Sequence, residues 1–152
     1  MPKNKNLFLG LLIFAVAGVV LICLFFYFTP KLACTKDKCF YVELAKTPAE
    51  LEKGLMYRAK LEDDKGMLFI LGREGVYPFW MKNTLIPLDI IWIGKDKKVV
   101  FISKNSQPCG QEVCPQINPG VVASYVLEIN AGISERIGLK KGIDMVFYGI
   151  IR

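Results

Sequence analysis

Residues 88–93 read LDIIWI and are followed at once by the turn sequence GKDK at residues 94–97. A short apolar run that ends in glycine and charged residues is typical of a strand that enters a hairpin. We therefore expect a strand over residues 88–93 that pairs back with a second strand over residues 98–103. This local pairing favours an antiparallel β-sheet as the basis of the fold.

Strand-like patterns also occur on both sides of this hairpin. Apolar and polar residues alternate over residues 39–45, and further strands are expected over residues 67–71, 79–84, 124–130 and 145–151. Strands and helices do not alternate in a sustained way, which disfavours a doubly wound parallel sheet. The sequence therefore predicts a mainly β fold with one short helix, mostly antiparallel, with a β-barrel or sandwich-like architecture.

The short helix is expected over residues 48–56. Thr47 supplies an N-cap hydroxyl, Pro48 suits the first helical position, and Glu50 stands three residues after the cap. This spacing is the signature of a capping box. Residues 133–137 are expected to form one further helical turn.

The N-terminal part of the chain differs in composition from the rest. Residues 7–28 form an uninterrupted run of 22 positions without charge, long enough to cross a bilayer of about 30 Å as a helix. A cleaved signal peptide is the alternative, but the run is long for one, and Lys31 occupies a position where a cleavage site needs a small residue. We expect a short cytoplasmic N-terminus over residues 1–6, a transmembrane signal anchor over residues 7–28, a linker over residues 29–38 and an extracytoplasmic domain over residues 39–152.

Charge and residue usage exclude several classes of function. Three of the 20 basic residues, Lys3, Lys5 and Lys31, flank the apolar run, which leaves 17 against 14 acidic residues in the remainder. Those charges are mixed and form no basic stripe, so we expect no nucleic-acid partner. Histidine is absent, which excludes Ser-His-Asp and Cys-His catalytic pairs. No phosphate-binding glycine loop is present, and we expect neither a cofactor nor a metal.

The cysteines carry information about the compartment. Cys23 lies within the apolar run, and the other four form two C-x4-C pairs, Cys34 with Cys39 and Cys109 with Cys114. Two local disulfides are the simplest interpretation; free thiols and a four-cysteine zinc site are the alternatives. Disulfides would place the domain outside the cytoplasm. The expected location is therefore the cell membrane, with a single pass and the folded domain on the outer side.

Seven short sequence blocks, each occurring once in the domain, follow one another along it. They are TPAE (47–50), KGLMYR (53–58), GMLF (66–69), FWMKNT (79–84), IPLD (86–89), YVLE (125–128) and AG (131–132). In these blocks the chain resembles the family catalogued as domain of unknown function 192. The resemblance implies a small β-rich domain that is often exported or tethered to the membrane in prokaryotes, and it implies no established activity.

The residues with most chemistry lie in these blocks, and three interpretations of them remain open. The candidate ligand-binding residues are Arg58, Trp80, Lys82, Asn83, Asp89 and Glu128. They form a structural polar network, a surface on which Trp80 stacks against a sugar or other ring, or a hydrolase site with Asp89 and Glu128 as paired carboxylates. Catalytic residues remain unknown. The sequence favours a non-catalytic binding or accessory module for a small molecule or glycan, with the lipid bilayer as a partner through residues 7–28 and the hydrolase as the alternative.

Overall fold

The computed structural model describes residues 5–27 and 29–150 and divides the chain into two compact units, Met1–Pro30 and Lys31–Arg152. The first unit contains helix α1 (Lys5–Tyr27). Among the described residues, no helix combines the length and the apolar character needed to cross a membrane. The predicted span over residues 7–28 therefore stays a prediction; Phe28 and residues 1–4 lie outside the described part of the chain.

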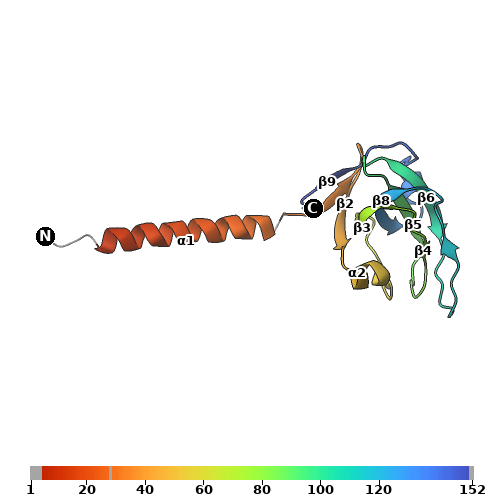
Figure 1. The fold of residues 1–152 in the computed structure, drawn as a ribbon, viewed down its shortest axis with the longest axis horizontal. Helices are drawn as coiled ribbons and strands as arrows, with labels where there is room; N and C mark the ends of the chain where they lie inside the picture. Colours follow the sequence, from red (N-terminus) through yellow and green to blue (C-terminus); the bar gives the residue numbers. More distant parts are fainter. Residues whose placement is uncertain (1–4, 28, 151–152) are drawn as a thin grey trace. The chain divides into compact units, whose positions relative to one another are not determined.

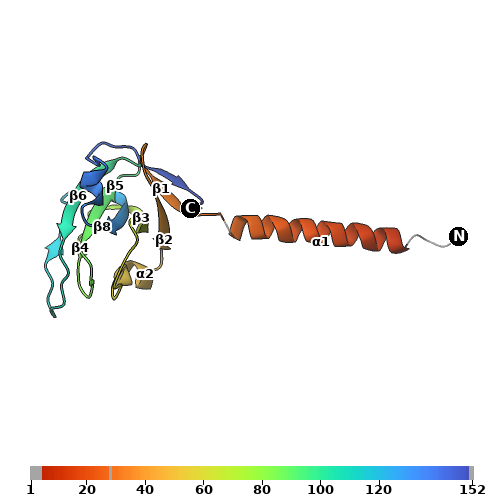
Figure 2. The same cartoon turned by 180° about the vertical axis from the view of Figure 1, so that it is seen from behind.

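The second unit is built on one large sheet. Its strand order is β6-β5-β8-β3-β2-β1-β9, and a separate two-stranded sheet pairs β4 with β7. Figures 1 and 2 show the large sheet from opposite sides, with α2 close to one end of β2. The strands are β1 (Leu32–Cys34), β2 (Cys39–Ala45), β3 (Lys65–Gly75), β4 (Phe79–Trp80), β5 (Leu88–Ile93), β6 (Val99–Ser106), β7 (Gln116–Ile117), β8 (Ala123–Asn130) and β9 (Val146–Tyr148); the helices are α2 (Pro48–Lys53) and α3 (Ile133–Arg136).

The mainly β class is confirmed, but the expectation of a barrel is wrong. The sheet has two edges, β6 and β9, which meet only near an isolated bridge between Lys98 and Asp144. The sheet is also mixed, because β2 and β3 run parallel. The crossover that parallel strands require is supplied by α2, so the helix is part of a strand–helix–strand unit.

Local patterns predicted most elements well. Strands β2 and β5 have the predicted bounds, and α2 begins with the predicted capping box: Glu50 N donates to the Thr47 hydroxyl, and Thr47 N donates to the Glu50 carboxylate. The extended segment over residues 79–84 is shorter than expected, because only Phe79 and Trp80 form a strand. The final strand is described over Val146–Tyr148, and Ile151 lies outside the described residues.

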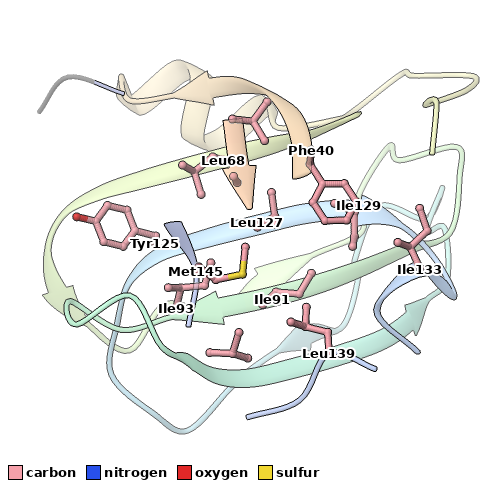
Figure 3. Packing of buried hydrophobic residues seen from close by; sticks show 13 residues of the cluster. Phe40, Leu68, Ile91, Ile93, Tyr125, Leu127, Ile129, Ile133, Leu139 and Met145 are labelled. Atoms are coloured by element: carbon pink, nitrogen blue, oxygen red, sulfur yellow. The ribbon is translucent and has the colours of Figure 1, made fainter. Parts of the chain in front are cut away.

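The large sheet is covered on both faces. One core gathers inward-facing residues of β2, β3, β5 and β8 with Ile133, Leu139 and Met145 from the segments that cover them (Figure 3). The second core lies on the other face around Phe69, Trp92 and Val126. Because both faces are covered, every residue of β5 is buried, which explains why this strand has an unbroken apolar sequence apart from Asp89.

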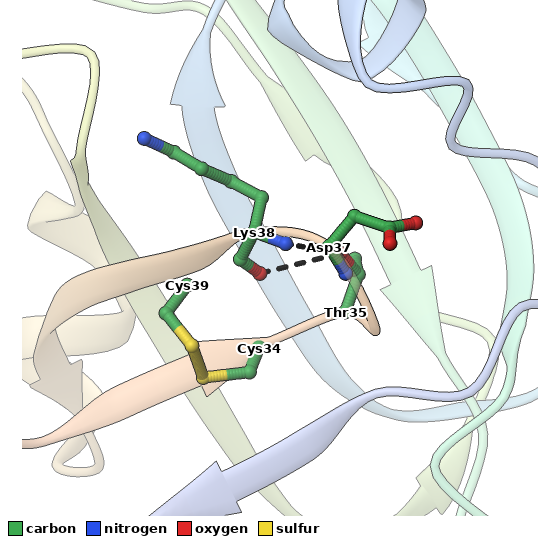
Figure 4. Close-up of a disulfide and its surroundings, with 5 residues drawn as sticks. All are labelled: Cys34, Thr35, Asp37, Lys38 and Cys39. Carbon is green, nitrogen blue, oxygen red and sulfur yellow. Dashed lines mark hydrogen bonds between the residues drawn. A yellow bond between two sulfur atoms is a disulfide. The ribbon is translucent and has the colours of Figure 1, made fainter.

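Both predicted disulfides are present, and they exclude the zinc site and the free thiols. Cys34–Cys39 joins paired positions of β1 and β2 across a turn in which Thr35 bonds to Lys38 (Figure 4). Cys109–Cys114 closes the loop that precedes β7. The backbone of Cys109 is also bonded to Met81 and Asn83, with N···O distances of 3.0 and 2.9 Å. This second disulfide therefore braces the segment that follows β4.

We predict that opening the Cys109–Cys114 disulfide loosens the segments over residues 81–84 and 109–117 and leaves the large sheet intact. Replacing Cys109 and Cys114 with serine removes a short covalent ring, which should cost about 2 kcal/mol of unfolding free energy. Amide hydrogen exchange should accelerate over residues 81–84 and 109–117 and stay slow in β5 and β8. The matched control, serine at Cys34 and Cys39, should accelerate exchange at β1 and β2 instead. Equal acceleration in β8 for the Cys109/Cys114 variant would contradict the prediction.

Candidate functional site

A pocket of about 320 Å³ opens between α2, β3 and the segment around β4. Its walls combine apolar and aromatic side chains with several polar and charged ones. The lining side chains used below are Leu51, Leu55, Phe69, Tyr77, Phe79, Trp80, Lys82 and Glu128. We call this cavity the Glu128 pocket, after the residue that sets its chemistry.

The turn after α2 gives the pocket its depth. Gly54 caps the C-terminus of α2 and has a positive φ of +47°, which favours glycine. A Cβ atom at this position would lie 3.1 Å from Phe69 Cζ and 3.6 Å from Glu128 Oε2. Gly54 therefore lets the chain reverse and also leaves room beside the carboxyl group of Glu128.

Glu128 is a buried carboxyl group in apolar surroundings. It lies on β8 opposite Met67 of β3 and Ile90 of β5, and it is only 5% exposed. Its Oε2 atom has no hydrogen-bond partner among the described residues. Burial raises the pKa of Glu128 from 4.5 to about 8. The carboxyl is therefore mostly protonated at neutral pH, with hydrogen-bonding capacity that the described residues leave unused.

Trp80 and Lys82 lie together at the mouth of the pocket. Trp80 is 38% exposed, and Lys82 Nζ lies 5.7 Å from the centre of its ring. Lys82 forms no ion pair with any residue in the described part of the chain, Asp89 and Glu128 included. The mouth thus offers an indole face and an ammonium group to a ligand.

Asn83 holds the mouth in shape. Its φ is +54°, and that of Tyr57 is +63°, so both residues adopt the left-handed conformation. Tyr57 N donates to Asn83 O, and Asn83 Nδ2 donates to Tyr57 Oη, both at 2.8 Å. Asn83 also lines a shallow hollow beside the pocket, together with Tyr57, Trp80 and Lys82. Asn83 therefore serves as a structural clip within the predicted binding surface.

Asp89 lies on the opposite face of the sheet from Glu128. In the β5–β8 register Asp89 faces Ile129 of the first core, whereas Glu128 faces Ile90 of the second. Asp89 is fully buried and accepts hydrogen bonds from the backbone N–H groups of Asn105 (2.8 Å) and Ser134 (2.9 Å). Its carboxylate joins the end of β6 and the start of α3 to β5. These two carboxyl groups do not converge, so Asp89 and Glu128 do not form the predicted paired-carboxylate site.

Arg58 also lies apart from the pocket. Its guanidinium makes two hydrogen bonds to the carboxylate of Glu43, one of them at 2.7 Å, on an exposed part of the surface. Of the six predicted binding residues, the structure therefore brings Trp80, Lys82 and Glu128 into one pocket. Asn83 lies beside them, and Asp89 and Arg58 belong to other interactions.

The apolar walls of the pocket were not predicted from the sequence. Leu51, Leu55 and Phe69 follow patterns that are equally typical of a closed core. One signal for the pocket was present in the sequence: in YVLEIN (125–130), Glu128 occupies a position at which alternation requires an inward-facing side chain. A charged residue at such a position is expected to be paired or functional.

A family model of domain of unknown function 192 (DUF192), described as an uncharacterised ACR, matches residues 31–147. The chain belongs to the DUF192 family. No curated protein matches it. A DUF192 assignment agrees with the predicted resemblance and carries no activity.

Two solved structures are similar to this DUF192 chain. One is a protein of unknown function from Novosphingobium aromaticivorans, with 38% identity, a TM-score of 0.70, and coverage of 77% of this chain and 83% of that one. The other is a protein from Sinorhizobium meliloti described as a candidate transcription regulator, with 35% identity, a TM-score of 0.71, and coverage of 80% and 95%. These matches support the fold of the second unit.

We predict that Glu128 makes the domain less stable as the pH rises from about 4.5 to about 8. Between these values the unfolded state ionises Glu128 and the folded state keeps it protonated, so the unfolded state binds fewer protons. The free energy of unfolding should therefore fall by up to about 1.4 kcal/mol per pH unit. Glu128→Gln should remove this part of the slope. Urea unfolding of both proteins at pH 5, 6.5 and 8 measures it.

The comparison between the two proteins isolates Glu128, since all other titrating groups are shared. Asp63 and Glu62, whose pKa values are lowered by hydrogen bonds and ion pairs, act in the opposite direction at lower pH in both proteins. Parallel stability curves for wild type and Glu128→Gln would show that Glu128 has the same pKa in both states. That result would contradict the burial described above.

Proposed function

We propose that this protein is a membrane-anchored, non-catalytic module that binds a small ligand in the Glu128 pocket. The observation that carries the proposal is the buried Glu128 carboxyl, which lines the pocket and has an oxygen without a partner. A buried polar group without a hydrogen bond costs about 1–3 kcal/mol. A ligand that bonds to this oxygen would recover that free energy on binding.

The shape and lining of the pocket support this function. Its volume of about 320 Å³ lies within the range that small-molecule sites occupy, and such sites combine apolar walls with a few polar groups. Trp80 at the mouth can stack on a ring of the ligand, and Lys82 can bond to an oxygen at its outer end. The apolar walls favour a ligand with an apolar body, and a glycan is better suited to the shallow hollow beside Tyr57.

The hydrolase alternative has less support. A glycosidase needs two carboxyl groups that face the same cavity about 5–10 Å apart. Here Asp89 faces the first core and is held by two backbone N–H groups, while Glu128 lines the pocket on the other face, so the predicted Asp89–Glu128 pair does not share a cavity. A single protonated carboxyl with apolar neighbours is better suited to holding a ligand than to hydrolysing one.

Membrane anchoring is a separate part of the proposal, supported by the uncharged run over residues 7–28 and by the helical conformation of Lys5–Tyr27. We predict that the full-length protein remains in the membrane pellet after alkaline carbonate extraction. Replacing Leu12 and Val19 with arginine should release it, because charges near the bilayer centre disfavour insertion. Release of the wild-type protein would contradict the anchor. Labelling of Lys104 by an impermeant reagent on intact cells would support the outer location.

We predict that ligands with an apolar body and one polar head bind the full-length protein in lipid nanodiscs. A ligand present at 100 times its Kd should stabilise the fold by about 2.7 kcal/mol, measured by thermal unfolding with empty nanodiscs as the blank. Trp80→Ala should weaken binding at least tenfold, since it removes one side of the mouth. Arg58→Ala is the matched control outside the pocket and should leave affinity unchanged. Ligands that bind to wild type and to Trp80→Ala with equal affinity would contradict the proposed site.

A further inference from the structure

We propose that the ligand of the Glu128 pocket carries a protonated amine at its buried end, which forms an ion pair with Glu128. This inference rests on the proposed function and names the chemical class of the ligand. It depends on which groups face the carboxyl, what the walls are made of, and where the protein's own cations lie.

The first argument is the unmet bonding of the carboxyl. Glu128 Oε2 has no partner among the described residues, and the cross-strand neighbours of Glu128 are the apolar side chains of Met67 and Ile90. Hydrogen bonds between an ammonium and a carboxylate are about twice as strong as those between neutral groups. An amine therefore gains more binding free energy from the Glu128 carboxyl than an alcohol or an amide of the same size.

The second argument is the aromatic lining. Phe69, Tyr77, Phe79 and Trp80 all line the pocket, and the Phe69 and Phe79 rings meet edge to face with centroids 4.9 Å apart. Aromatic rings attract cations through their faces, most strongly where water is excluded. The aromatic walls that surround Glu128 thus favour a cation.

The third argument is the position of the other charged groups. The titratable groups that line the pocket besides Glu128 are Glu52 and Lys53 of α2, Tyr77, and Lys82 after β4. Glu52 and Lys53 are exposed, and Lys82 is held above the Trp80 ring and forms no ion pair in the described part of the chain. No cation among the described residues therefore pairs with Glu128. The lysines at the mouth would repel a cation there and favour a neutral or anionic outer end of the ligand.

Binding as proposed has a definite proton balance. In the empty pocket at neutral pH the carboxyl carries its proton. When the ammonium enters, that proton passes to solvent, and the ammonium donates hydrogen bonds to the carboxylate that remains. One proton is released per ligand bound, so affinity must rise with pH until Glu128 is already ionised in the empty pocket. A neutral ligand bonded to the protonated carboxyl would show the opposite trend.

The experiment uses a panel of aryl-alkyl amines and their matched alcohols, such as 2-phenylethylamine and 2-phenylethanol, with the full-length protein in nanodiscs. Calorimetry at pH 6, 7 and 8, in two buffers of different ionisation enthalpy, measures affinity and proton release. We expect an amine to bind, its affinity to rise close to tenfold from pH 6 to pH 7 and about fivefold more from pH 7 to pH 8, and about one proton to be released at pH 6. The matched alcohol should bind at least tenfold more weakly at pH 7.

Glu128→Gln keeps the size of the side chain and cannot form the ion pair. Amine affinity should fall at least tenfold in this variant and lose its dependence on pH, while its thermal unfolding shows that it is folded. The proposal of an amine ligand would be overturned if the variant bound amines as tightly as wild type. A wild-type affinity that does not rise with pH would also overturn it. Preference for the alcohols would also overturn it but leave the pocket as a binding site. If neither the panel nor the other ligands with an apolar body and one polar head bind to the wild-type protein, both the amine proposal and the proposed binding function are contradicted.

Discussion

The alternation of side chains along β8 is the constraint on which the rest of this structure depends. β8 lies between β3 and β5, and both faces of the sheet are covered. Leu127 and Ile129 therefore enter one core, and Val126 and Glu128 face the other. A shift of one residue would expose neither face to water but would exchange the contents of the two cores. The carboxyl group of Glu128 would then lie among the aliphatic side chains of the first core.

This two-sided burial explains how the domain tolerates an unpartnered carboxyl. The dense packing around Phe69, Trp92 and Val126 stabilises the second face, and the capping box and the Gly54 turn hold α2 over it. Removal of a buried group without a hydrogen-bond partner generally stabilises a fold. An unpartnered carboxyl beside a cavity therefore lowers the free energy of unfolding of the empty domain. A ligand that occupies the cavity and bonds to the carboxyl would offset this loss.

Most of the local structure was predictable from the sequence because it depends on neighbours in the chain. The alternation in β2, the apolar run of β5 and the capping box at Thr47 each determine one element. The barrel was not correctly predicted, because closure depends on whether β6 and β9 pair along their length, and they meet only near Lys98 and Asp144. The parallel pairing of β2 with β3 was missed for a similar reason: a helix as short as α2 gave no sign that it serves as a crossover.

The candidate site was predictable only in part, since it combines residues that no linear motif brings together. Two candidates from the FWMKNT block, Trp80 and Lys82, lie at the mouth of the pocket, but the left-handed turn at Asn83 directs that residue to Tyr57. Asp89 and Glu128 both interrupt apolar strands and look equivalent in the sequence. Their roles diverge because Asp89 accepts hydrogen bonds from two backbone N–H groups, one at the end of β6 and one in α3, whereas Glu128 lies beside the space left by Gly54. The same residue chemistry thus gives a hydrogen-bonded structural carboxylate on one face and, among the described residues, a carboxyl with an unpartnered oxygen on the other.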